Sequence, residues 1–169
     1  FGASERQLTW VVVAYTIAGG GLLMLGGRLG DMFGRRRILL AGTAIFGAAS
    51  LLAGTAWSFP ILVAARLLQG VGEALALPAA MAIIVMLFPE GTPRSRALGV
   101  RAAVASCGLV LGFVLSGIIT EFLGWRSIFL VAIPFVAIVL VATSFLVPPG
   151  RSLERVPLDL RGAVLLTVT

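Results

Sequence analysis

The chain has 169 residues, of which 59% are hydrophobic and only 12% are charged, whereas an ordinary soluble domain has about 25% charged residues. A soluble fold of this length could not bury so much apolar surface, so composition excludes a soluble domain and indicates that lipid surrounds most of the chain. The net charge of +6 comes from arginines that form no stripe or aromatic-interleaved patch, which argues against nucleic-acid binding. The absence of histidine argues against a zinc site, and the single Cys107 excludes an internal disulfide. No cofactor is expected.

Five apolar segments are long enough to cross a bilayer core of about 30 Å, which takes about 20 helical residues. Because backbone in lipid must satisfy its own hydrogen bonds, these segments are predicted to be helices. The expected fold is therefore all-α, a polytopic membrane protein with five transmembrane helices plus a truncated sixth. The five spans are expected at Leu8–Leu29, Ile38–Trp57, Pro60–Phe88, Ala97–Phe122 and Ser127–Val147, and the sixth begins near Gly162.

Arginines divide unequally between the two sides when these spans alternate across the membrane. One side receives only Arg6 and Arg126. The positive-inside rule makes the other side cytoplasmic and predicts a multi-pass protein of the cell's inner, plasma membrane. The arginines on the cytoplasmic side are Arg28, Arg35, Arg36, Arg37, Arg94, Arg96, Arg151, Arg155 and Arg161.

The turn between the first two spans contains more than topology requires, because it also holds Asp31 and several spaced glycines. Its sequence GRLGDMFGRRRI, residues 27–38, resembles the cytoplasmic signature G-x-L-G/A-D-R/K-x-G-R-R/K-x-hydrophobic of the major facilitator superfamily. Only Met32 departs from that signature, where a basic residue is usual. The matching residues are Gly27, Leu29, Gly30, Asp31, Gly34, Arg35, Arg36 and Ile38.

The resemblance implies that Asp31 pairs with Arg35 and faces the positive N-terminus of a helix from the other half of the protein. A carboxylate at a helix N-terminus gains roughly 0.3–1 kcal/mol, so such a contact can latch one conformation and break in another. The alternative is that the arginines only anchor the turn to anionic headgroups. The expected latch residues are Gly27, Asp31, Gly34, Arg35 and Arg36.

The third span contains charges inside its apolar run. Its stretch RLLQGVGEAL, residues 66–75, resembles the R-x-x-Q-G-x-G pattern of the fourth helix of the same family. Helical periodicity places Arg66, Gln69, Gly70 and Glu73 on one face, where Gly70 leaves space for a neighbouring backbone or a ligand.

Glu73 lies about 20 Å from either end of its span, too deep for its carboxylate to reach water easily. A charge at that depth costs roughly 2.5–3.5 kcal/mol, so it should be paired or protonated. We therefore expect a proton-coupling site at Glu73 and Arg66, the role of Arg66 being implied by the resemblance. The alternatives are a purely structural pair between Glu73 and an arginine, of which Arg66 is one candidate, and an Arg66 that extends to the outer surface.

The fourth span carries small residues at Gly108, Gly112 and Gly117, which predicts a seam for close helix packing. Its stretch GLVLGFVLSG, residues 108–117, resembles the exporter pattern of the fifth helix in the family. Phe113 replaces the proline of that pattern, which weakens the argument for export. The stretch GWRSIFLVAIP, residues 124–134, resembles the entry to the family's sixth helix, with Ser127 and Ala132 departing.

The start of the first span, TWVVVAYT at residues 9–16, resembles the second helix of the fourteen-helix drug:proton antiporter branch. The resemblance therefore implies that residues 1–147 are helices 2 to 6 of an N-terminal six-helix bundle. Residues 148–161 would then be a cytoplasmic linker, and residues 162–169 the start of the next helix. On this expectation the chain is a fragment, with the first helix and the remainder of the protein missing.

The expected function is a proton-coupled secondary transporter that works by alternating access and exports small amphipathic drugs or metabolites. Uptake by symport, and a truncated membrane module that transports nothing, remain alternatives. No enzyme is expected, because the sequence offers no nucleophile–base set, metal cluster or phosphate loop. The expected partners are a small-molecule substrate, protons and membrane lipid, and the residues expected to face the substrate are Trp10, Tyr15, Gln69 and Phe113.

Overall fold

A computed structural model describes residues 5–147 as five helices, each long and apolar enough over its described residues to cross a membrane. This confirms the all-α membrane fold. The linker expected at 148–161 and the start of a further helix expected at 162–169 lie outside the described residues. The helices are α1 Glu5–Phe33, α2 Arg35–Gly54, α3 Phe59–Leu87, α4 Thr92–Leu123 and α5 Arg126–Leu146.

The turn between α1 and α2 is shorter than the sequence suggested. Helix α1 continues through the aspartate of the signature to Phe33, α2 begins at Arg35, and Gly34 alone connects them. Gly34 has a φ of 95°, a conformation that side chains with a Cβ rarely adopt. The glycine is therefore required by the reversal of the chain itself.

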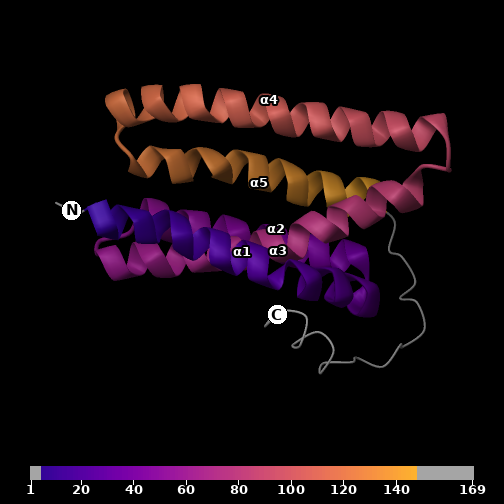
Figure 1. Cartoon of the computed structure of the whole chain (residues 1–169), viewed down its shortest axis with the longest axis horizontal. Coiled ribbons are helices and arrows are strands. Elements are labelled where there is room, and N and C mark those ends of the chain that lie inside the picture. Colours follow the sequence, from indigo (N-terminus) through magenta and orange to yellow (C-terminus); the bar gives the residue numbers. More distant parts are fainter. Residues whose placement is uncertain (1–4, 148–169) are drawn as a thin grey trace.

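Helix α3 lies between α1 and α2 and packs closely against both, whereas α1 and α2 touch each other much less. Helix α5 packs on α2, and α4 lies at the edge of the bundle beside α5 (Figure 1). Helix α1 makes no contact with α4. The α1–α2 turn, the α3–α4 turn and the end of α5 lie at the same end of the bundle, as alternating spans require (Figure 1).

Small residues allow the close approach of α3 to its two neighbours. A Cβ on Gly70 would lie 2.5 Å from the carbonyl oxygen of Tyr15 in α1, and one on Gly72 would lie 2.7 Å from the carbonyl oxygen of Gly42 in α2. In lipid the hydrophobic effect does not drive helices together, so contacts of this kind, where backbones meet, supply much of the packing energy. The space expected beside Gly70 is thus filled by the backbone of α1.

Helix α4 leaves the predicted seam open among the described helices. None of its residues is buried, and a Cβ on Gly108, Gly112 or Gly117 would meet nothing within 4 Å. No helix in the described part of the chain therefore packs on this seam, because α4 touches only α5 and, at a few positions, α3.

Candidate functional site

A chain of polar contacts crosses the middle of the bundle from α1 through α3 to α2. Arg66 of α3 donates from Nε to the carbonyl oxygen of Val11 at 3.1 Å and from a terminal nitrogen to Oε1 of Gln69 at 3.1 Å. Gln69 in turn donates from Nε2 to Oγ of Ser50 in α2 at 2.8 Å. These contacts place Arg66 inside the bundle, in contrast to the alternative in which it extends to the outer surface.

Ser50 determines how the amide of Gln69 is oriented. Its hydroxyl donates to the carbonyl oxygen of Phe46 at 2.8 Å, so its single proton is in use and its oxygen accepts from Gln69. The amide of Gln69 must then present its NH2 group to Ser50 and its oxygen to Arg66. The side chain of Gln69 is 2% exposed and that of Ser50 is fully buried, so this arrangement is protected from water.

The burial of Gln69 corrects its expected place on a substrate-facing surface, because both ends of its amide are engaged within the bundle in this conformation. Sequence reasoning missed Ser50 altogether. One serine in an apolar span gives no sign of which neighbour it faces, so only the packing of α2 on α3 reveals its role.

Two aromatic rings enclose the guanidinium group of Arg66. Its central carbon lies 4.6 Å from the centre of the Tyr15 ring and 5.7 Å from that of Phe129. A cation held over an aromatic face gains about 0.5–2 kcal/mol, more where water is excluded. Tyr15 thus contacts the predicted coupling residue, and Phe129 of α5 is a second residue that the sequence did not single out.

Glu73 lies one helical turn beyond Gln69 on the same face of α3. A methyl group on Gly19 of α1 would be 3.3 Å from Oε2 of Glu73. The carboxylate of Glu73 also interacts electrostatically with the hydroxyl of Tyr15 in α1. No ion pair joins Glu73 to Arg66, two residues that the structure describes, and Tyr15 interacts with both. The direct structural pair that was the alternative is therefore not formed.

Glu73 also reaches an apolar groove of about 450 Å³ that α2, α3 and α5 enclose. Among the described residues that line this groove it is the only charged one, next to side chains such as Phe46, Phe135 and Val136. Glu73 is half-buried in this position.

The structure does not bring the other expected substrate contacts together. Trp10 in α1 is 59% exposed and Phe113 in α4 is 74% exposed, and these two helices do not touch.

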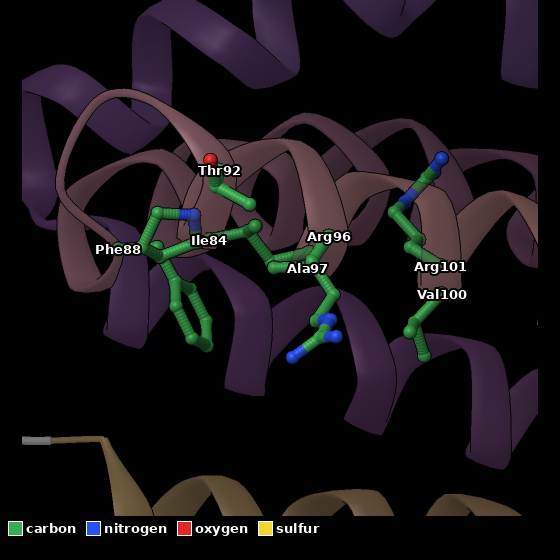
Figure 2. Close-up of a pocket in the computed structure, with 8 residues that line it drawn as sticks. Ile84, Phe88, Thr92, Arg96, Ala97, Val100 and Arg101 are labelled. Atoms are coloured by element: carbon green, nitrogen blue, oxygen red, sulfur yellow. The ribbon is translucent and has the colours of Figure 1, made fainter.

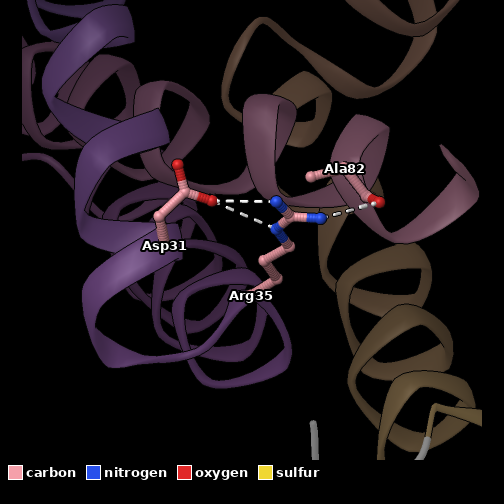
Figure 3. Close-up of polar contacts among 3 residues, drawn as sticks. All are labelled: Asp31, Arg35 and Ala82. Atoms are coloured by element: carbon pink, nitrogen blue, oxygen red, sulfur yellow. Dashed lines mark hydrogen bonds and ion pairs between the residues drawn. The ribbon is translucent and has the colours of Figure 1, made fainter. Parts of the chain in front are cut away.

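The signature turn ties three helices together. Arg35 donates to Oδ1 of Asp31 from Nε at 3.2 Å and from a terminal nitrogen at 3.0 Å, which is the pairing that the resemblance implied (Figure 3). Its other terminal nitrogen donates to the carbonyl oxygen of Ala82 in α3 at 3.4 Å (Figure 3). Both bonds from Arg35 to Asp31 end on one carboxylate oxygen, and the side chain of Asp31 is 56% exposed.

Arg36 connects the same turn to the end of α5. It donates to the carbonyl oxygen of Ser144 at 2.6 Å and to that of Thr143 at 3.4 Å. The last carbonyl groups of a helix have no partner within the helix and carry the negative end of its dipole, so an arginine there is doubly favourable. Gly27 lies against Pro78 of α3.

Comparison with known proteins agrees with this arrangement. The family model described as Major Facilitator Superfamily matches residues 1–168. A lincomycin resistance protein of Streptomyces lincolnensis is 54% identical over 99% of the chain, and a cephamycin export protein of Amycolatopsis lactamdurans is 45% identical over 98%. A puromycin resistance protein of Streptomyces alboniger is 44% identical over 97%.

The chain spans about a third of the length of these relatives, namely 34%, 35% and 33%. The family match, in contrast, covers nearly every residue of this chain and includes the signature turn and the polar face of α3. The chain therefore belongs to the major facilitator superfamily, a family of membrane transporters.

Proposed function

We propose that this chain forms part of a proton-coupled exporter of small amphipathic compounds in the plasma membrane, with its arginine-rich end in the cytoplasm. Relatives named for antibiotic resistance or export support the direction of transport and the class of substrate. The turn arginines support the orientation, because they would otherwise have to cross the bilayer.

The observation that carries the proposal is the group formed by Arg66, Tyr15 and Glu73 at the interface of α1 and α3. A half-buried carboxylate near mid-span is expensive to leave charged, whereas a nearby guanidinium favours the charged form. The balance between these effects changes when α1 and α3 shift relative to each other. Glu73 would therefore take up a proton in one conformation and release it in another, which is what coupling to alternating access requires.

In this proposal Asp31, Arg35 and Arg36 hold the latch that favours one conformation. Trp10, Tyr15 and Phe113 would contact substrate together with parts of the protein beyond this chain. The seam of Gly108, Gly112 and Gly117 is open among the described helices, and we assign it to packing against that remainder.

The proposal is tested by Glu73→Gln in the full-length protein, assayed in inverted membrane vesicles with lincomycin and puromycin as probes. Gln has the shape of a protonated Glu and cannot titrate, so uptake driven by a pH gradient should fall about tenfold or more, while exchange of substrate without a gradient persists. Glu121→Gln is the matched control, since Glu121 is exposed at the far end of α4, and it should transport normally.

Three outcomes would contradict the proposal. Unchanged gradient-driven transport in Glu73→Gln would remove Glu73 from the coupling mechanism. Movement of protons in the same direction as substrate would exclude antiport and favour uptake by symport. A full-length protein that moves neither probe nor any other amphipathic compound would favour the non-transporting module.

A further inference from the structure

Tyr15 of α1 contacts both charged residues of the central group. The centre of its ring lies 4.6 Å from the guanidinium carbon of Arg66, and its hydroxyl faces the carboxylate of Glu73, to which it can donate a hydrogen bond. Arg66 and Glu73 are seven residues apart on α3, which corresponds to about 10.5 Å along the helix axis. Tyr15 is half-buried and spans the distance between these two side chains.

The surroundings of Arg66 differ from those of the arginines near the beginning of α4. Arg96 is exposed, and it and Arg101 extend from opposite sides of α4 beside the groove between α3 and α4 (Figure 2). Arg66 instead donates from Nε to the carbonyl oxygen of Val11 and from a terminal nitrogen to Oε1 of Gln69, both at 3.1 Å. Its guanidinium group is therefore fixed inside the bundle, and the ring that α1 lays against it has a defined position.

Neither Gln69 nor the groove beside Glu73 offers a second connection of this kind. Both ends of the Gln69 amide are engaged, one by Arg66 and the other by α2. The residues of α2 and α5 that the structure places along the groove carry no ionisable group, and Thr43 is their one polar member. Among the described residues, the ionisable groups that interact with Glu73 are therefore Tyr15 of α1 and Arg66 of α3 itself.

We propose that Tyr15 is a positioning residue for proton coupling, which makes the proton of Glu73 respond to the position of α1 against α3. Its ring holds α1 to the arginine of α3, and its hydroxyl lies where it stabilises the charged carboxylate. A shift of α1 that withdraws Tyr15 removes this hydrogen-bond donor, so Glu73 takes up a proton from water. When Tyr15 returns, Glu73 releases that proton to water. This inference rests on the proposed function, in which Glu73 carries the coupled proton.

The test compares Tyr15→Phe with the unchanged full-length protein in inverted membrane vesicles that take up puromycin. The substitution removes the hydroxyl and keeps a ring over Arg66. With the pH difference across the membrane held constant, the pH of half-maximal uptake should rise by roughly half a unit to one unit, or about threefold to tenfold in proton concentration, because the charged carboxylate has lost a donor. A residue that only fills space would not move this pH profile.

Two further variants separate the hydroxyl from the ring and from the helix. Tyr15→Leu removes both parts of the side chain, so it should shift the pH profile as Tyr15→Phe does and lower the maximal rate further, since Arg66 also loses one of its two rings. Thr16→Val is the matched control, because it removes an exposed hydroxyl from the next residue of α1, one that donates to the carbonyl oxygen of Val12 at 3.0 Å. It should leave both the pH profile and the rate unchanged.

The outcomes distinguish this inference from the proposed function. If Tyr15→Phe keeps the original pH profile while Glu73→Gln still reduces gradient-driven uptake, the inference is overturned and the proposed function stands. An equal shift in Thr16→Val would also overturn it, since the effect would then belong to α1 in general. Unchanged gradient-driven uptake in Glu73→Gln would overturn the proposed function itself, and Tyr15 would have no coupled proton to position.

Discussion

At the scale of single residues, the structure shows how a cation is kept inside an apolar bundle. Arg66 has a backbone carbonyl, a side-chain amide and two aromatic rings around it, so its charge is solvated by protein groups in place of water. Gln69 is the central member, because it connects the arginine to Ser50 in the neighbouring helix. A buried polar chain of this kind is stable only while every member has a partner.

We expect Gln69→Leu to lower the free energy of unfolding by roughly 1–3 kcal/mol, because both Arg66 and Ser50 lose a buried partner. Ser50→Ala should cost less, since it leaves only one end of the amide without a partner. The two changes together should cost less than their sum, because each breaks the same hydrogen bond. Thermal unfolding of the full-length protein and its three variants measures this coupling, and strictly additive losses would show that the bond contributes nothing.

At the scale of helices, α3 is the helix against which both α1 and α2 pack. Its small residues let α1 approach on one side and α2 on the other. Its polar side chains reach both neighbours, because Arg66 and Glu73 lie against α1 and Gln69 binds Ser50 in α2. The same close contacts that position Arg66 and Glu73 also leave no room for added atoms. The same contacts between helices therefore determine both the packing of α3 and the position of the site.

Adding a methyl group at this interface should therefore be costly. In Gly72→Ala the new Cβ would lie 2.7 Å from the carbonyl oxygen of Gly42, and α2 would have to move, at a cost of about 1–3 kcal/mol. Gly99→Ala in α4 is the comparison, because nothing lies within 4 Å of its added Cβ and alanine favours the helix by up to about 1 kcal/mol. Opposite shifts in unfolding temperature are expected, and a shift in the same direction would contradict the assigned packing.

At the scale of the whole molecule, the α1–α2 turn couples helices that are distant along the chain. Arg35 reaches α3 and Arg36 reaches the end of α5, while Asp31 holds Arg35 in place. Any rearrangement that moves α5 against α1 must break or remake these bonds. The turn is therefore suited to bias the protein between conformations, as the latch proposal requires.

Asp31→Asn should slow transport by the full-length protein with little change in its affinity for substrate, because the amide weakens the hold on Arg35 without touching the central site. Transport rates and equilibrium binding measured side by side separate these effects. Glu90→Gln is the control, since Glu90 and Arg94 form an ion pair of the same spacing at the other turn and Glu90 is 89% exposed. If both variants slow transport equally, the Asp31 pair has no special role.

The sequence alone was sufficient to predict the five helices, because a bilayer of fixed thickness demands long apolar runs and the charged residues mark their ends. It also placed Arg66, Gln69, Gly70 and Glu73 on one helical face, because helical periodicity is a local property. Which helix covers that face is not local. Residues that face lipid and residues that face protein are equally apolar in a membrane, so hydropathy does not distinguish them.

The tertiary structure alone decided the contacts between helices. It placed Tyr15 and Phe129 around Arg66, made Ser50 the partner of Gln69, and left the glycines of α4 without a neighbour among the described helices. It also shortened the turn expected between Leu29 and Ile38 to a reversal at Gly34. These features depend on how backbones approach in three dimensions, which is set by shape and hydrogen bonding between segments far apart in the sequence.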